Sequence, residues 1–337
     1  MVTTLPPADG PLDRVVVVIP TLNEERHIAA VLRQVIEGDP VAAASPVFVA
    51  DGGSTDRTGE IVTALGAEFP NLRLLHNPGR TQAAALNMAR EGACGTADIL
   101  IRCDAHAAYP ERFVSRLVDA MRAQRADSVV VPMDAMAESG CFQRGLAWIA
   151  DSKLGAGGSA HRGGTASGFV DHGHHAAFRL AAFAALGGYD TGFRANEDAE
   201  YDRRLTDAGG RIWLDGGIRI GYFPRSTPGG LLKQYYHYGR GRAQTCLKHR
   251  IRPKLRQLIP VVNLVLLAAS LALVPFNAMG LLWPLVYGAL LAGAAVSSAR
   301  RHGSPCALWG GPAIGIMHIA WGYGFLMRIA GIGRSGR

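Results

Sequence analysis

Short apolar runs alternate with longer amphipathic segments over the first 132 residues of the chain. The apolar runs predict strands at 14–19, 46–50, 72–76, 98–103 and 128–132. The segments between them predict helices at 24–36, 56–65, 81–91 and 110–123. Strands and helices that alternate in this way are typical of a parallel, doubly wound sheet with helices on both faces. The pattern therefore predicts an α/β domain.

Two stretches lack this alternation. Residues 1–13 contain three prolines, and they predict a flexible N-terminal tail. Residues 133–168 are glycine-rich and irregular, which suits loops over a binding site. Farther along, a helix is predicted from Asn196 to Leu205, and it should end near Gly209 and Gly210.

The C-terminal part of the chain is apolar enough for a membrane. Residues 258–299 contain no Lys, Arg, Asp or Glu, and this length is about twice what one bilayer crossing needs. We therefore expect two crossings that turn near 275–280, and a third apolar segment follows at 305–327. The alternative, buried core helices, is favoured for segments of about 10–14 residues, and these are longer. The pattern predicts a membrane domain over 258–330 with two to three transmembrane helices.

Positive charge gathers just before the first apolar segment. The formal net charge of the 337 residues is +8. The basic residues in question are Lys233, Arg240, Arg242, Lys248, Arg250, Arg252, Lys254 and Arg256. Basic residues beside a membrane span mark the cytoplasmic side and attract anionic headgroups, so 233–257 is predicted to be an interfacial segment. No base-stacking aromatics form a reading motif with them, which disfavours nucleic acid as a partner.

The N-terminus shows no signal-peptide pattern. We therefore expect a multi-pass protein of the inner (plasma) membrane with its α/β domain in the cytoplasm. The five cysteines, Cys94, Cys103, Cys141, Cys246 and Cys306, are odd in number, scattered and without a C-x-x-C pair. Their spacing predicts neither a disulfide framework nor a zinc site.

Polar groups follow three of the predicted strands, at the edge where open α/β sheets bind their ligands. They are Pro20, Leu22 and Glu24 after the first strand, Asp51 after the second, and Asp104 and His106 after the fourth. The Asp-x-His pair can hold a divalent cation against a diphosphate. Asp51 can accept a hydrogen bond from a base N–H, or it can simply form a turn with the glycines that follow it. No glycine-rich phosphate loop is present, so nucleotide binding would use carboxylates and a metal.

Three further clusters carry candidate chemistry. Glu197 and Asp198 stand at the start of a predicted helix, where a carboxylate could take a proton from a hydroxyl. Glu200 and Asp202 are interpreted as complements of the helix dipole. Arg240 and Arg242 could clamp a diphosphate, although a membrane-facing amphipathic helix explains them as well. The histidines at 172, 174 and 175 lack a helical i, i+4 pair, so loop roles around an acceptor are favoured over metal binding.

Five motifs, each weak alone, occur in a consistent order at 20–24, 51–56, 77–82, 104–106 and 196–198. In this order they resemble a family 2 glycosyltransferase with the GT-A fold, the Rossmann-like fold of nucleotide-diphospho-sugar transferases. The resemblance covers 14–245 and implies a glycosyltransferase domain at 14–232. Segments at 170–179, 187–190, 224–227 and 235–242 are similar to those of membrane-anchored members that act in exopolysaccharide synthesis.

The resemblance implies inverting transfer of a sugar, expected to be glucose from UDP-glucose, to a lipid-linked oligosaccharide. Asp198 would be the general base, and Glu197 would help to orient the acceptor. The implied nucleotide-sugar ligands are Pro20, Leu22, Glu24, Asp51, Arg80, Asp104, Arg240 and Arg242. Asp104 and His106 would hold Mg²⁺ or Mn²⁺, which acts as a Lewis acid on the departing diphosphate.

The sequence departs from the family pattern at two places. His106 replaces the usual second Asp, which favours Mn²⁺ over Mg²⁺ because imidazole suits softer ions. The Gln-x-x-Arg-Trp motif of processive synthases is replaced by residues 238–242, which favours addition of a single sugar.

Two other readings stay open. The acceptor could be a bare polyprenyl phosphate, as for dolichol-phosphate mannose synthases, although the stretch at 155–175 favours the oligosaccharide. A non-catalytic scaffold protein is disfavoured because Asp51, Asp104 and Asp198 are all retained.

Overall fold

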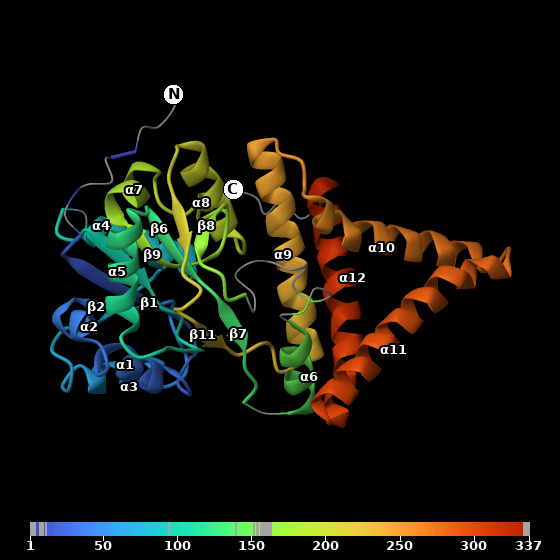
Figure 1. Cartoon of the computed structure of the whole chain (residues 1–337), viewed down its shortest axis with the longest axis horizontal. Coiled ribbons are helices and arrows are strands. Elements are labelled where there is room, and N and C mark those ends of the chain that lie inside the picture. The colour runs from blue at the N-terminus through green and yellow to red at the C-terminus, as the bar shows by residue number, and fades with distance from the viewer. Residues whose placement is uncertain are drawn as a thin grey trace. The chain divides into compact units, whose positions relative to one another are not determined.

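The computed structural model describes residues 5–6, 10, 12–93, 95–138, 140–150, 152, 155 and 164–332. The chain divides into two compact units (Figure 1). The first comprises Met1–Asp134, Gly163–Phe193 and Glu197–Tyr222, and the second comprises Ala135–Arg162, Arg194–Asn196 and Phe223–Arg337. Much of the predicted tail at 1–13 lies outside the described residues. Leu12 is buried, and its carbonyl oxygen accepts hydrogen bonds from the Arg122 side chain.

Eight strands form the main sheet of the first unit, in the order β3-β2-β1-β4-β9-β6-β10-β8. In chain order they are β1 (Val15–Thr21), β2 (Val47–Asp51), β3 (Leu72–His76), β4 (Ile99–Arg102), β6 (Ser128–Val131), β8 (Gly168–Val170), β9 (His174–Arg179) and β10 (Ile212–Leu214). A small second sheet has the order β5-β11-β7. Its strands are β5 (Ala107–Ala108), β11 (Ile220–Tyr222) and β7 (Met133–Ala135).

Helices pack on both faces of the main sheet because its strands direct apolar side chains alternately to either face. On β1, Val15, Val17 and Ile19 belong to one core, and Val16 and Val18 belong to the other. The first core includes α1 (Ile28–Ile36), α2 (Pro40–Ala44), α3 (Thr58–Leu65) and α5 (Phe113–Gln124). The second includes α4 (Gln82–Ala93), α7 (Leu180–Ala185) and α8 (Glu197–Asp207). The predicted α/β architecture is confirmed.

The five predicted strands run in one direction, as expected, but the sheet is mixed because β8 and β9, which were not predicted, run the other way. Strands β3, β2, β1 and β4 are parallel neighbours, and so are β6 and β10. Strand β9, however, lies antiparallel between β4 and β6, and β8 is antiparallel to β10. Strands β8 and β9 run in the same direction but are not neighbours, because β8 pairs with β10 and β9 pairs with β4 and β6.

The second unit is helical. It contains α6 (Cys141–Ala150), α9 (Pro228–His249), α10 (Leu255–Leu273), α11 (Leu282–His302) and α12 (Gly310–Ile329), with short 3-10 helices η1 (Ala278–Leu281) and η2 (Pro305–Trp309). Helix α12 lies against α9, where a Cβ on Gly239 or Gly324 would collide with a backbone carbonyl of the other helix. Small residues of this kind allow two helix backbones to approach closely. The stretch at 133–168 was expected to be irregular, but it contains β7 and α6.

Two segments, Leu255–Leu273 and Ala278–His302, are long and apolar enough to cross a membrane, and little of either is buried. They form a helical hairpin (Figure 1), in which Trp283 Nε1 donates to Asn263 Oδ1 at 3.1 Å. The third apolar segment forms α12, and half of its residues are buried. Among the described residues, two segments thus meet the criterion for a span, the lower end of the predicted range.

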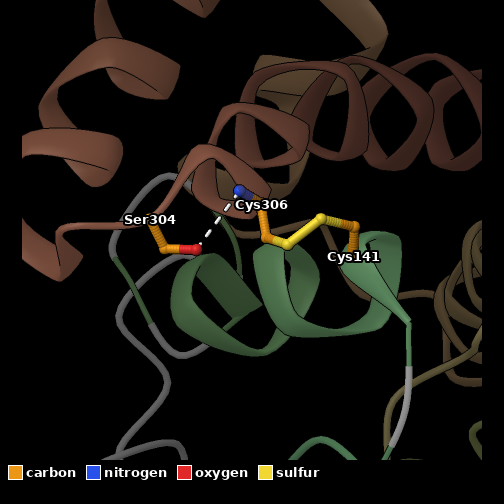
Figure 2. Close-up of a disulfide and its surroundings, with 3 residues drawn as sticks. All are labelled: Cys141, Ser304 and Cys306. Carbon is orange, nitrogen blue, oxygen red and sulfur yellow. Dashed lines mark hydrogen bonds between the residues drawn. A yellow bond between two sulfur atoms is a disulfide. The ribbon is translucent and has the colours of Figure 1, made fainter.

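The expectation of no disulfide is wrong. Cys141, at the start of α6, is bonded to Cys306 in η2, and their Cα atoms are 4.6 Å apart (Figure 2). The two residues are separated by 165 positions in the sequence, so only the fold of the second unit brings them together. Next to the bond, the backbone N–H of Cys306 donates to Ser304 Oγ (Figure 2). Cys103 and Cys246 are free and buried, and Cys94 lies outside the described residues.

Replacing Cys141 with Ser should lower the thermal unfolding midpoint of the detergent-solubilised protein in non-reducing buffer. A cross-link over so long a loop constrains the unfolded chain and typically contributes about 2–4 kcal/mol. The difference between variant and wild type should vanish in dithiothreitol, which opens the bond in the wild type. Equal midpoints in non-reducing buffer would contradict this account.

Candidate active site

The strand order creates a topological switch point in the first unit. After β1 the chain adds β2 and β3 on one side, and then it returns to place β4 on the other side of β1. Open α/β sheets bind ligands at such a point, at the carboxyl ends of the strands. The antiparallel β9 starts at this edge, because His174 and His175 pair with Val131 and Val130 at the end of β6. Residues from β1, β2, β4 and β9 are therefore brought to one edge.

The loops after β1 and β2 are fastened to each other. The Asn23 backbone N–H donates to Ser54 Oγ at 2.8 Å, and the Thr55 N–H donates to Asn23 Oδ1 at 2.8 Å. The Glu24 N–H donates to Thr58 Oγ1, also at 2.8 Å. Asn23 adopts a left-handed conformation with φ of 57°. Both its backbone N–H and its side chain bind the second loop. These bonds fix the backbone that carries Pro20, Leu22 and Glu24.

Asp51 ends β2 and faces its own loop. Its carboxylate accepts hydrogen bonds from Ser54 Oγ at 2.5 Å and from the Ser54 N–H at 3.1 Å. The next residue, Gly52, lies against Arg80, since a Cβ on Gly52 would be 3.3 Å from Arg80 Cα. Leu22 is exposed at this edge. Of the predicted nucleotide ligands, Asp51 and Arg80 therefore lie beside the loop that holds Leu22.

Asp104 lies in a site of mixed charge just after β4. Its Oδ1 accepts from Arg102 Nε at 3.1 Å and from Nη2 at 3.0 Å, and its Oδ2 lies 3.3 Å from His174 Nε2. The Asp104 N–H donates to Tyr109 Oη at 2.5 Å. Burial opposes ionisation of the carboxyl, but Arg102 and His174 hold the pKa of Asp104 below its usual range. Asp104 is therefore a carboxylate, and it is already paired with a guanidinium.

His106 is oriented by Glu24. His106 Nδ1 lies 2.8 Å from Glu24 Oε1, so a residue predicted for the nucleotide pocket and one predicted for the metal are in contact. A carboxylate that fixes an imidazole in this way is a common partner of metal-binding histidines. The structure therefore joins the loop after β1 to the segment after β4.

Asp104 and His106 suit a divalent cation only when a substrate supplies further ligands. Among the described residues, no group of three or more His, Cys, Asp or Glu side chains is arranged to hold a metal ion. Mg²⁺ is commonly bound by one or two carboxylates together with substrate phosphates rather than by an all-protein cage. Asp104 and His106 supply a carboxylate and an imidazole of the right kind, so the residues fit an ion that arrives with a diphosphate.

Glu197 and Asp198 open α8. Burial and the neighbouring Asp198 carboxylate raise the pKa of Glu197 to about 7. Burial alone would raise the pKa of Asp198 as well, but His172 and other nearby cations hold it below its ordinary value. The pair therefore divides into a carboxyl group that holds its proton near neutrality and a carboxylate able to accept one. This separation is typical of acid–base sites.

Arg102 connects the two groups of carboxylates. Its side chain is 7% exposed, and its positive charge is stabilised by Asp104, Glu197 and Asp198 together. A cation at this position favours the ionised form of each carboxylate near it. The sequence analysis did not select Arg102, although a charged residue that ends an otherwise apolar, buried strand was a usable signal.

The sequence analysis also missed the partners of Asp202. This side chain is not a dipole complement at a solvated helix end, because it is buried between His172 and His175. Glu200 is buried too, and it forms a bidentate ion pair with Arg204. The spacing of Asp198 and Asp202, one helical turn apart, could have shown that both face the sheet.

The two remaining predicted ligands belong to the second unit. Arg240 and Arg242 lie on α9. Arg240 Nη1 donates to the Ile332 carbonyl at 3.0 Å and to Tyr236 Oη at 3.3 Å. The glycines beside these arginines are packing positions, since a Cβ on Gly241 would collide with the carbonyl of Ala195. Binding of a diphosphate by these arginines stays a prediction.

Comparisons with known proteins show the family and the fold of the chain. Residues 16–187 match the family model described as Glycosyl transferase family 2. The chain is 44% identical over 310 residues to the succinoglycan biosynthesis protein ExoA of Rhizobium meliloti (strain 1021), covering 92% of this chain and 93% of that protein. It is 26% identical over 232 residues to a dolichyl N-acetyl-α-D-glucosaminyl phosphate 3-β-D-2,3-diacetamido-2,3-dideoxy-β-D-glucuronosyltransferase of Methanococcus voltae, with coverage of 66% and 71%.

Among solved structures, the mannosyltransferase PcManGT of Pyrobaculum calidifontis, in complex with GDP-Man and Mn²⁺, superposes with a TM-score of 0.65. It shares 20% sequence identity, and the match covers 94% of this chain and 87% of that one. At this identity the likeness concerns the fold, and it confirms the predicted GT-A fold. The family model and the identity to ExoA show that the chain belongs to glycosyl transferase family 2.

Proposed function

We propose that the protein is an inverting, metal-dependent enzyme that transfers glucose from UDP-glucose to a lipid-linked oligosaccharide during assembly of an exopolysaccharide or cell-envelope polysaccharide. The observation that carries the proposal is the cluster at the switch point. There Arg102 joins Asp104, the candidate diphosphate-side carboxylate, to Glu197 and Asp198, the candidate acceptor-side carboxylates.

Asp198 accepts the proton of the acceptor hydroxyl. It is the carboxylate of the pair whose pKa is held low, so it is ionised at neutral pH. Glu197 retains a proton near neutrality and can donate a hydrogen bond that orients the acceptor. A base on the acceptor side and a leaving diphosphate on the other are what in-line displacement with inversion requires.

The donor is held by the loops after β1, β2 and β3. Asp51, fixed by Ser54, accepts a hydrogen bond from the base, while Pro20, Leu22 and Glu24 line the nucleotide pocket. Arg80 lies close enough to Gly52 to reach the same ligand. Asp104 and His106 would hold Mg²⁺ or Mn²⁺, which when bound neutralises charge on the leaving diphosphate.

The names of two relatives and the apolar hairpin of α10 and α11 support the proposed acceptor and location. ExoA is named for succinoglycan biosynthesis, and the Methanococcus relative is named for a dolichyl N-acetyl-α-D-glucosaminyl phosphate substrate. This chain carries two helices able to span a membrane. A lipid-linked acceptor places the reaction at the bilayer surface, and the basic residues before α10 favour the cytoplasmic leaflet of the inner membrane.

A panel of labelled nucleotide sugars tests the proposal. Purified protein in detergent is incubated with UDP-glucose, UDP-galactose, UDP-N-acetylglucosamine or GDP-mannose, each with Mn²⁺, Mg²⁺ or EDTA, and release of nucleoside diphosphate is measured. We expect turnover of UDP-glucose that EDTA abolishes. Turnover of GDP-mannose with a bare polyprenyl phosphate as acceptor would support the alternative reading instead.

The basic residues before α10 should hold the active site at the membrane. Lys248, Arg250, Arg252 and Lys254 are exposed, and so are the nearby apolar side chains Leu247 and Leu255. Each surface-facing basic residue adds about 1 kcal/mol of attraction to an anionic leaflet, and less at high salt.

Replacing these four basic residues with Gln should slow transfer to a lipid-linked acceptor in anionic vesicles while sparing hydrolysis of the donor by water. Arg240 and Arg242 stay unchanged in this variant because their proposed role is on the diphosphate. Equal loss of both reactions would refute the membrane-docking role.

A further inference from the structure

Four polar side chains are linked in series inside the second core of the first unit, and so far only His172, at one end, has been related to the proposed chemistry. Ser128 on β6 donates to the Ala177 carbonyl at 3.0 Å, and its Oγ lies 2.7 Å from His175 Nδ1. His175 Nε2 lies 2.5 Å from Asp202 Oδ1, and Asp202 Oδ2 lies 2.5 Å from His172 Nδ1. Four side chains from β6, β9, α8 and the β8–β9 connection are thus linked in series.

The two ends of this series of side chains differ in burial. Ser128 and His175 are 0% exposed and Asp202 is 1% exposed, whereas the His172 side chain is 22% exposed. The buried end needs its polar partners simply to satisfy hydrogen bonds inside the protein. His172 does not need Asp202 for that reason alone, because its side chain is partly exposed.

Asp202 and Asp198 are four residues apart on α8, so their side chains lie on the same face of that helix. His172 is bound to Asp202, and among the nearby cations it has the largest effect in lowering the pKa of Asp198. The titratable groups around Asp198 are Glu197 and Asp202 on α8, Arg102 on β4, His174 and His175 on β9, His172 just before β9, and Tyr189. Of these cationic side chains, His172 is the one that both binds Asp202 and is partly exposed.

We propose that His172 is a positioning residue for the transfer reaction: Asp202 fixes its ring, and the ring keeps the Asp198 carboxylate charged and in place for the acceptor hydroxyl. The inference rests on the proposed function, and it adds a residue that neither the motifs nor the comparisons assign. Asp202 and His175 serve it as the buried anchor that sets the orientation of the imidazole.

His172→Asn tests this proposal. The amide nitrogen of Asn takes the place of Nδ1 and can still donate to Asp202, but the imidazole charge is gone. Without it the pKa of Asp198 rises, and Asp198 is protonated over a wider range of acid pH. We expect the acid limb of kcat/KM for UDP-glucose transfer to move up by about one pH unit, which lowers activity about tenfold on that limb. Binding of UDP should be unchanged.

Two companion variants separate positioning from mere stability. Ser128→Ala removes the hydroxyl at the buried end of this series of side chains. It should lower the thermal unfolding midpoint while leaving the acid limb of kcat/KM in place. His172→Gln is a second uncharged replacement, and it should reproduce the shift of His172→Asn.

The outcomes are distinguishable. A wild type that transfers sugar, together with an acid limb that does not move in either His172 variant, overturns the inference and leaves the proposed function standing. Loss of folded protein in both His172 variants also overturns it, because it assigns the residue a structural role. A wild type with no transfer of any nucleotide sugar overturns the proposed function itself.

Discussion

Asp198→Asn should reduce sugar transfer by about a hundredfold or more while leaving UDP binding within a few-fold of wild type. The amide keeps the shape of the side chain at the start of α8, but it cannot accept the proton of the acceptor. Glu197, whose pKa is raised to about 7 by burial and by the Asp198 charge, has the separate proposed role of orienting the acceptor. Rates are measured with labelled UDP-glucose and a lipid-linked acceptor, and binding is measured by calorimetry.

Asp207→Asn is the matched control for that variant. Asp207 ends the same helix, is exposed, and pairs with Arg203 at 2.7 Å on the surface. Exposed pairs of this kind contribute little, so the control should transfer sugar at the wild-type rate. If Asp198→Asn keeps more than about a tenth of wild-type turnover, Asp198 is not the base.

Asp104→Asn should weaken Mn²⁺-dependent binding of UDP by about a hundredfold, since even indirect partners of a metal commonly contribute 10–100-fold to its affinity. The variant also leaves Arg102 without its ion pair. Titration of Mn²⁺ in the presence of UDP, followed by the loss of the free-ion paramagnetic resonance signal, measures this directly. The same titration without UDP should show weak binding to the wild type, because Asp104 is then engaged by Arg102.

His106→Asp tests the other proposed ligand. A second carboxylate makes the site harder, so the preference should move from Mn²⁺ towards Mg²⁺. Asp119→Asn, an exposed acid on α5, is the control and should not change either titration. An unaltered metal preference in the His106 variant would show that this imidazole does not touch the ion.

The fold was predictable where local pattern determines it. The runs that became β1, β2 and β4 carry alternate side chains to two cores, and the helices between the strands show the matching period. The direction of β9 was not predictable, because it depends on pairing with β4 and β6, which lie far from β9 in the sequence. The bond between Cys141 and Cys306 escaped prediction for a similar reason, since distant segments must first pack together.

The residues of the candidate site were also predictable only in part. Motifs found Asp51, Asp104 and Asp198, because short spacings carry those residues to the ends of strands and helices. They did not find Arg102 or the partners of Asp202, whose roles come from burial. A histidine such as His172 has no recognisable spacing to Asp202, and only the packing of α8 against the sheet brings the two together.

One measurement tests the central claim most directly. The purified protein in anionic vesicles is given radiolabelled UDP-glucose, Mn²⁺ and a lipid-linked saccharide extract, and the organic phase is then analysed for label. The account predicts one labelled sugar added per acceptor by the wild type and none by Asp198→Asn under the same conditions. Label that enters the lipid phase equally with both proteins, or with neither while donor binding is intact, would contradict it.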